Sequence, residues 1–350
     1  MIRKVSIPLV VGVIVAAGVG PSPVAASISL GLACIVLLLL ASKRRCGYPV
    51  AYALFFLCGF SAFCSASIAG GPRLDIPFSA RPVSELILGM PFAHESTGDL
   101  VNALVTGDRS GLDPGISRAF RLSGASHILA LSGLHLGIIY ALMSSLLSVC
   151  GNSPAAIRFR CIATTFCAAL YTFATGAGPS TVRALLFICI NEAASLHPDR
   201  KKDSLSVLWT ALTVQLAANP LIIGSAGFQL SYLAMLGIFT CYPILRDFYP
   251  KAGGKIASRL DLPGRIWNSA ALSISCQLFT APLAAVLFGT FPKYFLLTNL
   301  IALPLTELLI TESLVCMILQ LPGLCPAVML DMVDRTAEAL TSSLGIISRM

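Results

Sequence analysis

The chain has 350 residues, of which 56% are hydrophobic and 11% charged, and its mean hydropathy is +0.84. Soluble domains carry about 25% charged residues, so this composition excludes a water-soluble surface and predicts a polytopic membrane protein. The formal charge of +8 indicates cytoplasmic loops rich in Lys and Arg, with a nucleic-acid footprint as the alternative explanation.

Three apolar segments open the chain, and we interpret residues 1–69 as an amino-terminal membrane segment with three spans. Pro21 and Pro23 separate the first segment from the second. The first segment has the pattern of a signal peptide. Another apolar run follows at once, however, which favours a transmembrane hairpin. The expected spans are residues 5–20, 24–41 and 48–67.

Residues 70–123 differ in composition, because they hold most of the early acidic residues and short amphipathic pieces. We interpret them as a short extracytoplasmic segment that lies at the membrane surface. Three basic side chains in this segment, Arg109, Arg118 and Arg121, are candidate phosphate contacts at an entrance. The alternative is that they are ordinary solvated surface charges.

Residues 124–350 return to long apolar runs, and we expect them to form a transmembrane channel domain. Pro304 interrupts its last long span, and the tail after it is amphipathic, either interfacial or a weak final span. The expected spans are residues 126–149, 161–175, 180–196, 204–218, 222–243, 266–288 and 294–321. The whole chain is therefore predicted to be an all-α bundle of about ten spans, with broken helices and interfacial amphipathic helices.

Basic loops predict the orientation of this bundle. With the amino terminus in the cytoplasm, every dense basic loop falls on the cytoplasmic side, and residues 70–123 fall outside. We therefore expect a multi-pass protein of a bacterial cytoplasmic membrane with a cytoplasmic amino terminus.

The stretch from Gly124 to Leu142 organises the chain, because it is apolar yet carries His127 and His135. The two His are eight residues apart, about two turns of a continuous helix, which puts them on one side. They would line a polar path, or instead fix the bundle through interhelical hydrogen bonds. Gly133 and Gly137 have the G-x-x-x-G spacing of a close-packing helix face.

Other polar side chains lie in or beside apolar runs. Arg183 follows a Gly/Pro-rich break and is the best candidate for a phosphate contact; a structural ion pair or snorkelling is the alternative. Gln229, Ser231 and Asn299 are further path candidates, with polar packing between helices as their alternative role. Glu307 and Glu312 are either paired or part of an ion-coupled path.

Cysteine and histidine give no sign of a metal centre. The 12 Cys contain no C-x-x-C, and the four His form neither H-x-H nor H-x-x-x-H. We predict no disulfide, no metal, no cofactor and no catalytic residue. An intramembrane hydrolase is disfavoured, because Ser132 and the two His lack a convincing nucleophile–base spacing and no carboxylate orients either His.

Four stretches together resemble the ComEC family of bacterial DNA-uptake proteins, in order and in spacing. They are LVNALVTGDRSGLDPGISRAFRLSGASHILALSGLHLGIIYAL, GPSTVRALL, NPLIIGSAGFQLSYLAMLGI and LTNLIALPL. The resemblance implies a membrane-embedded competence domain that passes one strand of DNA inward during transformation. Family members commonly add an OB-like domain and a metallo-β-lactamase-like nuclease domain. We expect both to be absent, since residues 70–123 are short and no H-x-H-x-D-H motif occurs.

The expected function is therefore a non-enzymatic channel for inward translocation of single-stranded DNA. Its partners would be single-stranded DNA and the lipid bilayer, with a separate nuclease, a cytoplasmic DNA motor and a second copy of the chain as further candidates. Two alternatives stay open: a secondary transporter of a smaller anion, and a non-catalytic scaffold or degenerate paralogue.

Overall fold

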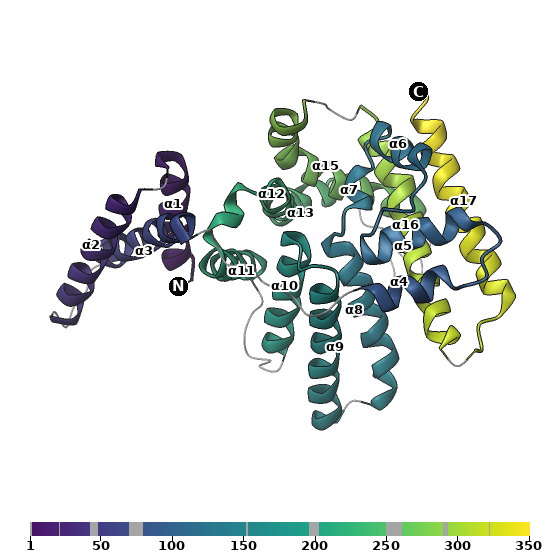
Figure 1. Cartoon of the computed structure of the whole chain (residues 1–350), viewed down its shortest axis with the longest axis horizontal. Coiled ribbons are helices and arrows are strands. Elements are labelled where there is room, and N and C mark those ends of the chain that lie inside the picture. The colour runs from purple at the N-terminus through teal and green to yellow at the C-terminus, as the bar shows by residue number, and fades with distance from the viewer. Residues whose placement is uncertain are drawn as a thin grey trace. The chain divides into compact units, whose positions relative to one another are not determined.

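The computed structural model describes residues 2–20, 22–42, 48–69, 80–151, 153–195, 203–249, 261–289, 293–321 and 323–350. All regular structure in these ranges is helical (Figure 1), which confirms the prediction of an all-α membrane protein. Contacts divide the chain into two compact units, residues 1–75 with 186–239 and residues 76–185 with 240–350. These boundaries differ from the division at residues 69 and 123, which stays a prediction about membrane location.

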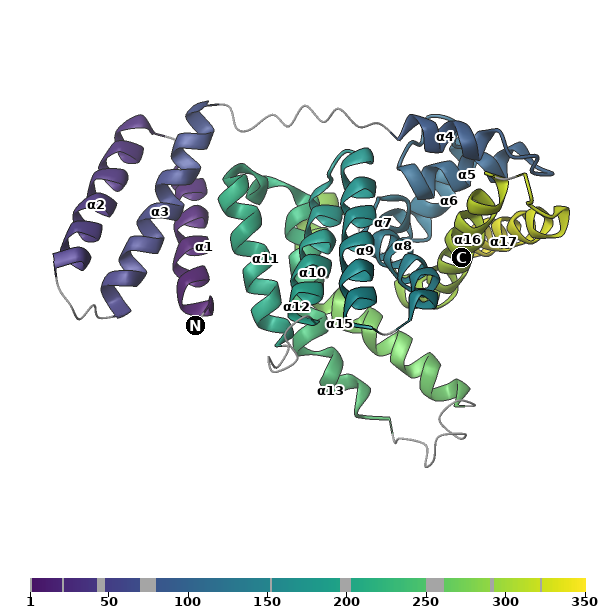
Figure 2. The same cartoon turned by 90° about the horizontal axis from the view of Figure 1, so that it is seen from below.

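The first unit is built mainly from apolar helices. Helices α1 and α2 each pack against α3, and the three lie side by side (Figure 2). Gly12 of α1 faces the backbone of Phe56, and Gly59 of α3 faces the backbone of Leu9, so the two helices approach without intervening side chains. The elements are α1 (Ile2–Val19), α2 (Pro23–Ser42), α3 (Tyr48–Ala69), α11 (Ser204–Ala218), η2 (Pro220–Gly224) and α12 (Ala226–Thr240).

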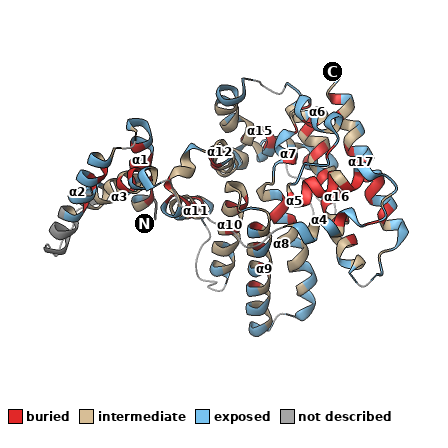
Figure 3. Ribbon diagram, viewed as in Figure 1, coloured by how far each residue is buried: buried red, intermediate tan, exposed pale blue. Residues whose placement is uncertain are grey.

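Many residues of α1 and α2 are exposed (Figure 3), and several of them are large and apolar. Val11, Ile14, Val24 and Ile28 are all more than two-fifths exposed. A surface of this kind is expected where helices meet lipid, because acyl chains offer no hydrogen bonds and favour branched apolar groups. The exposure therefore fits a unit that is embedded in a bilayer.

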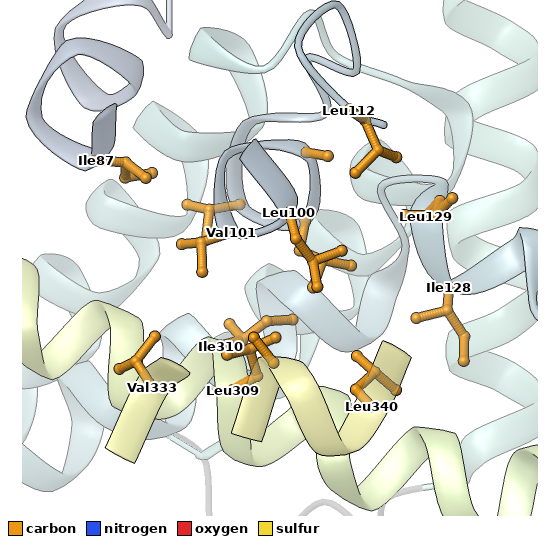
Figure 4. Close-up of a cluster of buried hydrophobic side chains, with 14 of the residues drawn as sticks. Ile87, Leu100, Val101, Leu112, Ile128, Leu129, Leu309, Ile310, Val333 and Leu340 are labelled. Atoms are coloured by element: carbon orange, nitrogen blue, oxygen red, sulfur yellow. The ribbon is translucent and has the colours of Figure 1, made fainter. Parts of the chain in front are cut away.

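The second unit surrounds a buried helix, α5, with helices from both halves of its sequence. Leu100 and Val101 of α5 face Leu309 and Ile310 of α16, with Val333 of α17 beside them (Figure 4). The elements are α4 (Arg81–Leu88), α5 (Glu95–Thr106), α6 (Pro114–Leu122), α7 (Ser126–Leu129), α8 (Gly133–Leu147), η1 (Ser148–Cys150), α9 (Pro154–Ala174), the start of α10 (Pro179–Ser195), α13 (Tyr242–Arg246), α15 (Leu262–Phe288), α16 (Phe295–Gln320) and α17 (Ala327–Ile347).

The burial of α5 qualifies the sequence interpretation of residues 70–123. These residues were expected to lie at the membrane surface, whereas α5 is enclosed by α16 and α17, with Leu100 and Val101 each 1% exposed. Helices α4 and α6 do keep exposed polar faces, which carry Arg81 and Arg118. Whether this segment lies outside the membrane stays a prediction, and residues 70–79 lie outside the described ranges.

Within the described ranges, four stretches are long and apolar enough to cross a membrane. They are Ala51–Ala69, Gly133–Cys150, Leu262–Phe288 and Phe295–Gln320, and further apolar helices of the chain are shorter. The total of about ten spans therefore stays a prediction. The basic residues at 43–45, 200–202 and 251–259, on which the orientation argument depends, lie outside the described residues.

One expected helix is broken. Residues 126–149 were predicted as a single span, but α7 ends at Leu129 and α8 begins at Gly133. Ala130 and Ser132 have extended backbones, so the chain leaves the helical path for three residues. His127 and His135 therefore do not lie on one continuous helix, and the spacing argument that placed them on the same side was wrong.

Candidate functional site

The α7–α8 break, residues 130–132, is held in place by a capping box at the start of α8. The Oγ of Ser132 accepts a hydrogen bond from the N–H of Leu134 at 3.2 Å. The Nδ1 of His135 accepts from the N–H of Ser132 at 3.1 Å. Because these bonds satisfy backbone groups that a helix end leaves open, Ser132 starts a new helix here.

The other end of the break is fixed by the loop that follows α5. Arg109 donates from Nη2 to the carbonyl oxygen of Leu129, the last residue of α7, at 2.8 Å. Gly107 ends α5 with a left-handed φ of 82°, and a Cβ there would stand 2.6 Å from Cδ1 of Leu131. Arg109 was predicted as an entrance contact for phosphate, and its guanidinium lies at this break.

Arg183 lies at the opposite end of the break, against the first residue of α8. It is 8% exposed, and its Nη2 lies 3.2 Å from the position that a Cβ on Gly133 would occupy. The side chain of Ala184 lies 3.3 Å from the same position. Gly133 therefore makes room for α10, whereas a Cβ on Gly137 would meet no described atom within 4 Å.

Arg183 and His135 approach the same turn of α8 from different faces. Gly133, which contacts Arg183, and His135 are two residues apart, and such positions lie on opposite sides of a helix. The structure thus gathers Arg109, Arg183 and His135 around one break, but it does not place them along a single helix face. The other His of this stretch, His127, is exposed, and its Nδ1 lies 3.2 Å from the carbonyl oxygen of Gly124.

Several buried polar atoms in candidate spans have no hydrogen-bond partner among the described residues. They include Nε2 of His135, Oδ1 of Asn299, Oγ1 of Thr306 and Oε2 of Glu312. His135 is 1% exposed and Thr306 is fully buried. Since Nδ1 of His135 accepts hydrogen bonds, its proton belongs on Nε2, which is a buried donor without an acceptor. A buried polar group that is left without any partner costs about 1–3 kcal/mol.

Two path candidates belong to the other unit. Gln229 of α12 donates from Nε2 to the carbonyl of Ile223 at 2.6 Å, which ties α12 to η2. Ser231 is half-buried in the same helix. Gln229 thus makes a structural contact, the alternative role given for it above. Arg118 and Arg121 are exposed on α6. This exposure is expected both for phosphate contacts at an entrance and for solvated surface charges.

Ser132 and His135 also bear on the prediction that the chain is not a hydrolase. The Oγ of Ser132 lies 3.0 Å from Nδ1 of His135, a distance suited to a nucleophile and its base, which their spacing was not expected to give. Both atoms, however, are used in the capping box, and no carboxylate hydrogen bonds to His135 among the described residues. The absence of enzymatic activity stays a prediction.

The break, its two guanidinium groups and both His lie within one matched region. The family model described as "Competence protein" matches residues 104–350, more than half of the chain. The chain belongs to the competence protein family. The resemblance to ComEC-type proteins that four stretches carried is thereby confirmed.

Two curated members of the family show how much of a relative this chain represents. It is 27% identical to "ComE operon protein 3" of Bacillus subtilis (strain 168) over 236 residues, which cover 67% of this chain and 27% of that protein. It is 30% identical to "Competence protein ComA" of Neisseria gonorrhoeae over 138 residues, 38% of this chain and 20% of that protein. The match thus spans about a quarter of these relatives' length, and no solved structure matches.

The structure adds residues that sequence reasoning missed. They are Gly107 and Leu131, which pack closely beside the break, and Tyr171 of α9. The hydroxyl of Tyr171 donates a hydrogen bond to the carbonyl oxygen of Val105 in α5 at 2.7 Å. The S-x-x-H spacing of Ser132 and His135 is a sequence signal that could have predicted the capping box at the start of α8. No local sequence signal relates Tyr171 to Val105, which are 66 residues apart.

Proposed function

We propose that this chain conducts single-stranded DNA inward across the cytoplasmic membrane during natural transformation. Membership of the competence family supports a role in DNA uptake. The observation that carries the proposal is the position of Arg183, a buried cation placed against the first turn of α8. A buried Arg in a membrane protein is costly and is retained where it faces a cavity, a partner or a charged substrate.

A channel for a polyanion needs cations that bind phosphate without trapping it. Arg109 and Arg183 supply two guanidinium groups at one break in the bundle. Both present planar arrays of donors suited to phosphate oxygens. The exposed Arg118 and Arg121 on α6 belong to the same proposal as an outer contact surface, and His127 and Asn299 as polar lining.

The remaining elements of the proposal follow from this role. The chain lies in the cytoplasmic membrane with its amino terminus in the cytoplasm and does no chemistry on the strand. A separate nuclease supplies the single strand, and a cytoplasmic motor pulls it. A second copy of the chain completes the conduit if one bundle does not enclose it.

The test is transformation of a strain in which the gene is deleted. Wild-type protein restores transformation, whereas Arg183→Ala, at equal membrane abundance, restores none, because the buried phosphate contact is lost. Arg335→Ala is the matched control, since Arg335 is an exposed Arg that pairs with Asp331 in α17. Normal transformation with well-expressed Arg183→Ala would remove Arg183 from the path. Normal transformation without the gene would favour a scaffold or a degenerate paralogue.

The α7–α8 break also favours a second function, secondary transport of a smaller anion. Transporters place the amino-terminal ends of broken helices against anionic substrates. Uptake of a radiolabelled small anion by vesicles that hold the purified protein, without any effect of deletion on transformation, would select this alternative.

A further inference from the structure

We propose that Cys325 is a site of oxidative modification and that Cys316 resolves it, so that the two thiols form a disulfide that fastens the start of α17 to the end of α16. The reactant is a disulfide of low molecular weight, such as oxidised glutathione. Both cysteines are free thiols in the structure. The inference goes beyond the proposed function and does not depend on transport of DNA.

The turn after α16 sends the chain back along the helix that it has just left. Gly323 has a left-handed φ of 72°, and its N–H donates to the carbonyl of Gln320 at 2.9 Å. The N–H of Leu324 donates to the carbonyl of Leu319 at 2.9 Å. This pair of bonds is the Schellman arrangement, which closes a helix end and turns the chain away from the helix axis. Cys325 is the next residue, and α17 then packs along α16.

The thiols of Cys316 and Cys325 are neighbours in the folded chain. Cys316 lies one turn before the end of α16 in the hydrophobic core of the second unit, and Cys325 packs against that core. The thiol of Cys316 interacts electrostatically with the thiol of Cys325. A disulfide needs two side chains that already face each other, because its length and dihedral angle leave little freedom. The contact between the two thiols therefore favours a bond between them.

Exposure sets the order in which the two thiols react. Cys325 is half-buried, and it follows Leu321 and Leu324, which are 75% and 69% exposed, so a reagent in water reaches this turn. Cys316 is 0% exposed and can react only with a group that is already attached to Cys325. An accessible thiol beside a second, resolving thiol is the arrangement that reversible thiol oxidation uses.

The reaction consists of two thiol–disulfide exchanges. The thiolate of Cys325 attacks one sulfur of oxidised glutathione, which forms a mixed disulfide at Cys325 and releases one glutathione thiolate. The thiolate of Cys316 then attacks Sγ of Cys325, which forms the Cys316–Cys325 bond and releases the second glutathione thiolate. The two cysteines together give up two protons and two electrons, and the reagent takes up both as two molecules of reduced glutathione.

The test uses the full chain, purified under reducing conditions in maltoside micelles and then freed of reductant. Oxidised glutathione is added at a concentration at which Cys64, which is 0% exposed in α3, stays reduced. The remaining thiols are blocked with N-ethylmaleimide, and peptide mass spectrometry without reduction identifies each disulfide. We expect the wild-type chain to form the Cys316–Cys325 bond and dithiothreitol to reverse it.

Two serine variants separate the roles of the thiols. Cys316→Ser keeps the accessible thiol and should accumulate glutathione at Cys325, because no second thiol displaces it. Cys325→Ser should leave Cys316 unmodified, because the reagent does not reach a buried thiol. The proposal is overturned if wild-type protein keeps glutathione at Cys325, if Cys325 does not react, or if Cys316 takes up glutathione in Cys325→Ser.

The bond should also stabilise the α16–α17 hairpin. A disulfide restricts the unfolded chain, so the oxidised protein should unfold at a midpoint about 2–10 °C above that of the reduced protein. Hydrogen exchange of the peptide that covers residues 325–333 should become severalfold slower. Cys316→Ser treated with oxidised glutathione is the matched control and should show neither change. Equal midpoints and equal exchange in the oxidised and reduced wild-type protein would refute the fastening of α17 to α16.

Discussion

Asp334 in α17 accepts a hydrogen bond from the backbone N–H of Ala93 at 2.8 Å, although the two residues are 241 positions apart. Asp334 is 5% exposed, and the contact joins the last helix to the loop before α5. We predict that Asp334→Ala lowers the free energy of unfolding by about 1–3 kcal/mol, because the N–H of Ala93 loses its acceptor.

Asp334→Asn is the matched control, because its amide oxygen can still accept from Ala93. Thermal unfolding of the detergent-solubilised protein measures both variants, with Asn closer to wild type than Ala. Equal midpoints for the two variants would show that the contact does not stabilise the fold.

The glycines of α1 and α3 predict a contrast within the first unit. A Cβ at Gly12 would overlap the backbone of Phe56, which cannot move as a flexible side chain does. We expect Gly12→Ala to cost about 1–3 kcal/mol through forced separation of the helices. Gly31→Ala in α2, where no described atom lies within 4 Å, should be neutral or stabilise by up to about 1 kcal/mol. Folded yield in membranes compares them, and equal yields would contradict the packing.

Gly133 and Gly137 give a second pair, inside a single helix. Gly133→Ala places a methyl group between α8 and the side chains of Arg183 and Ala184 and should reduce thermal stability or displace Arg183. Gly137→Ala meets no described neighbour and should not destabilise. Equal shifts of the unfolding midpoint for the two substitutions would show that α10 does not pack on Gly133.

Tyr171 provides a prediction about the support of the site. Tyr171→Phe removes only the hydroxyl that donates to the carbonyl of Val105. We expect a loss of about 1 kcal/mol and a faster hydrogen exchange of the peptide that covers residues 105–109. Thr175→Ala, which removes a hydroxyl that bonds only within its own helix, should leave that exchange unchanged.

Orientation is tested by reporter fusions. An alkaline phosphatase reporter, which is active only outside the cytoplasm, should be active after Ser110 and inactive after Ser153. The reverse pattern would mean that the bundle is inserted with the opposite orientation and would place the break at the other membrane surface.

Residues that start or end helices explain why many elements were predictable from the sequence. Pro154 and Pro179 begin α9 and α10, and Asn219 with Pro220 ends the helix before η2. Proline has no N–H to donate in a helix interior and is favoured in a first turn. Helix boundaries of this kind can therefore be predicted from the local sequence. Composition alone was enough for the membrane class, because the charge deficit is spread along the whole chain.

The break and the buried helix were beyond local reasoning for different physical reasons. The sequence around Ser132 stays apolar, so the hydrophobic pattern gives no sign of a helix boundary there. The boundary is created by the side chains of Ser132 and His135, which form the capping box. Helix α5 looks like a surface helix, because its amino-terminal half contains Glu95 and Asp99, yet α16 and α17 cover it. Those helices follow about 200 residues later, and their packing decides its burial.

The early end of α7 leaves α8 with a short apolar length. Gly133–Cys150 has 18 residues and extends about 27 Å, whereas a hydrocarbon core is about 30 Å thick. Its neighbour α16 has 26 residues and reaches about 39 Å. In one bilayer, the longer helix α16 is expected to tilt. The bilayer is expected to become thinner beside the shorter helix α8. Such thinning would bring headgroups and water closer to Gly133, and under the proposed function it would lower part of the barrier to a charged strand.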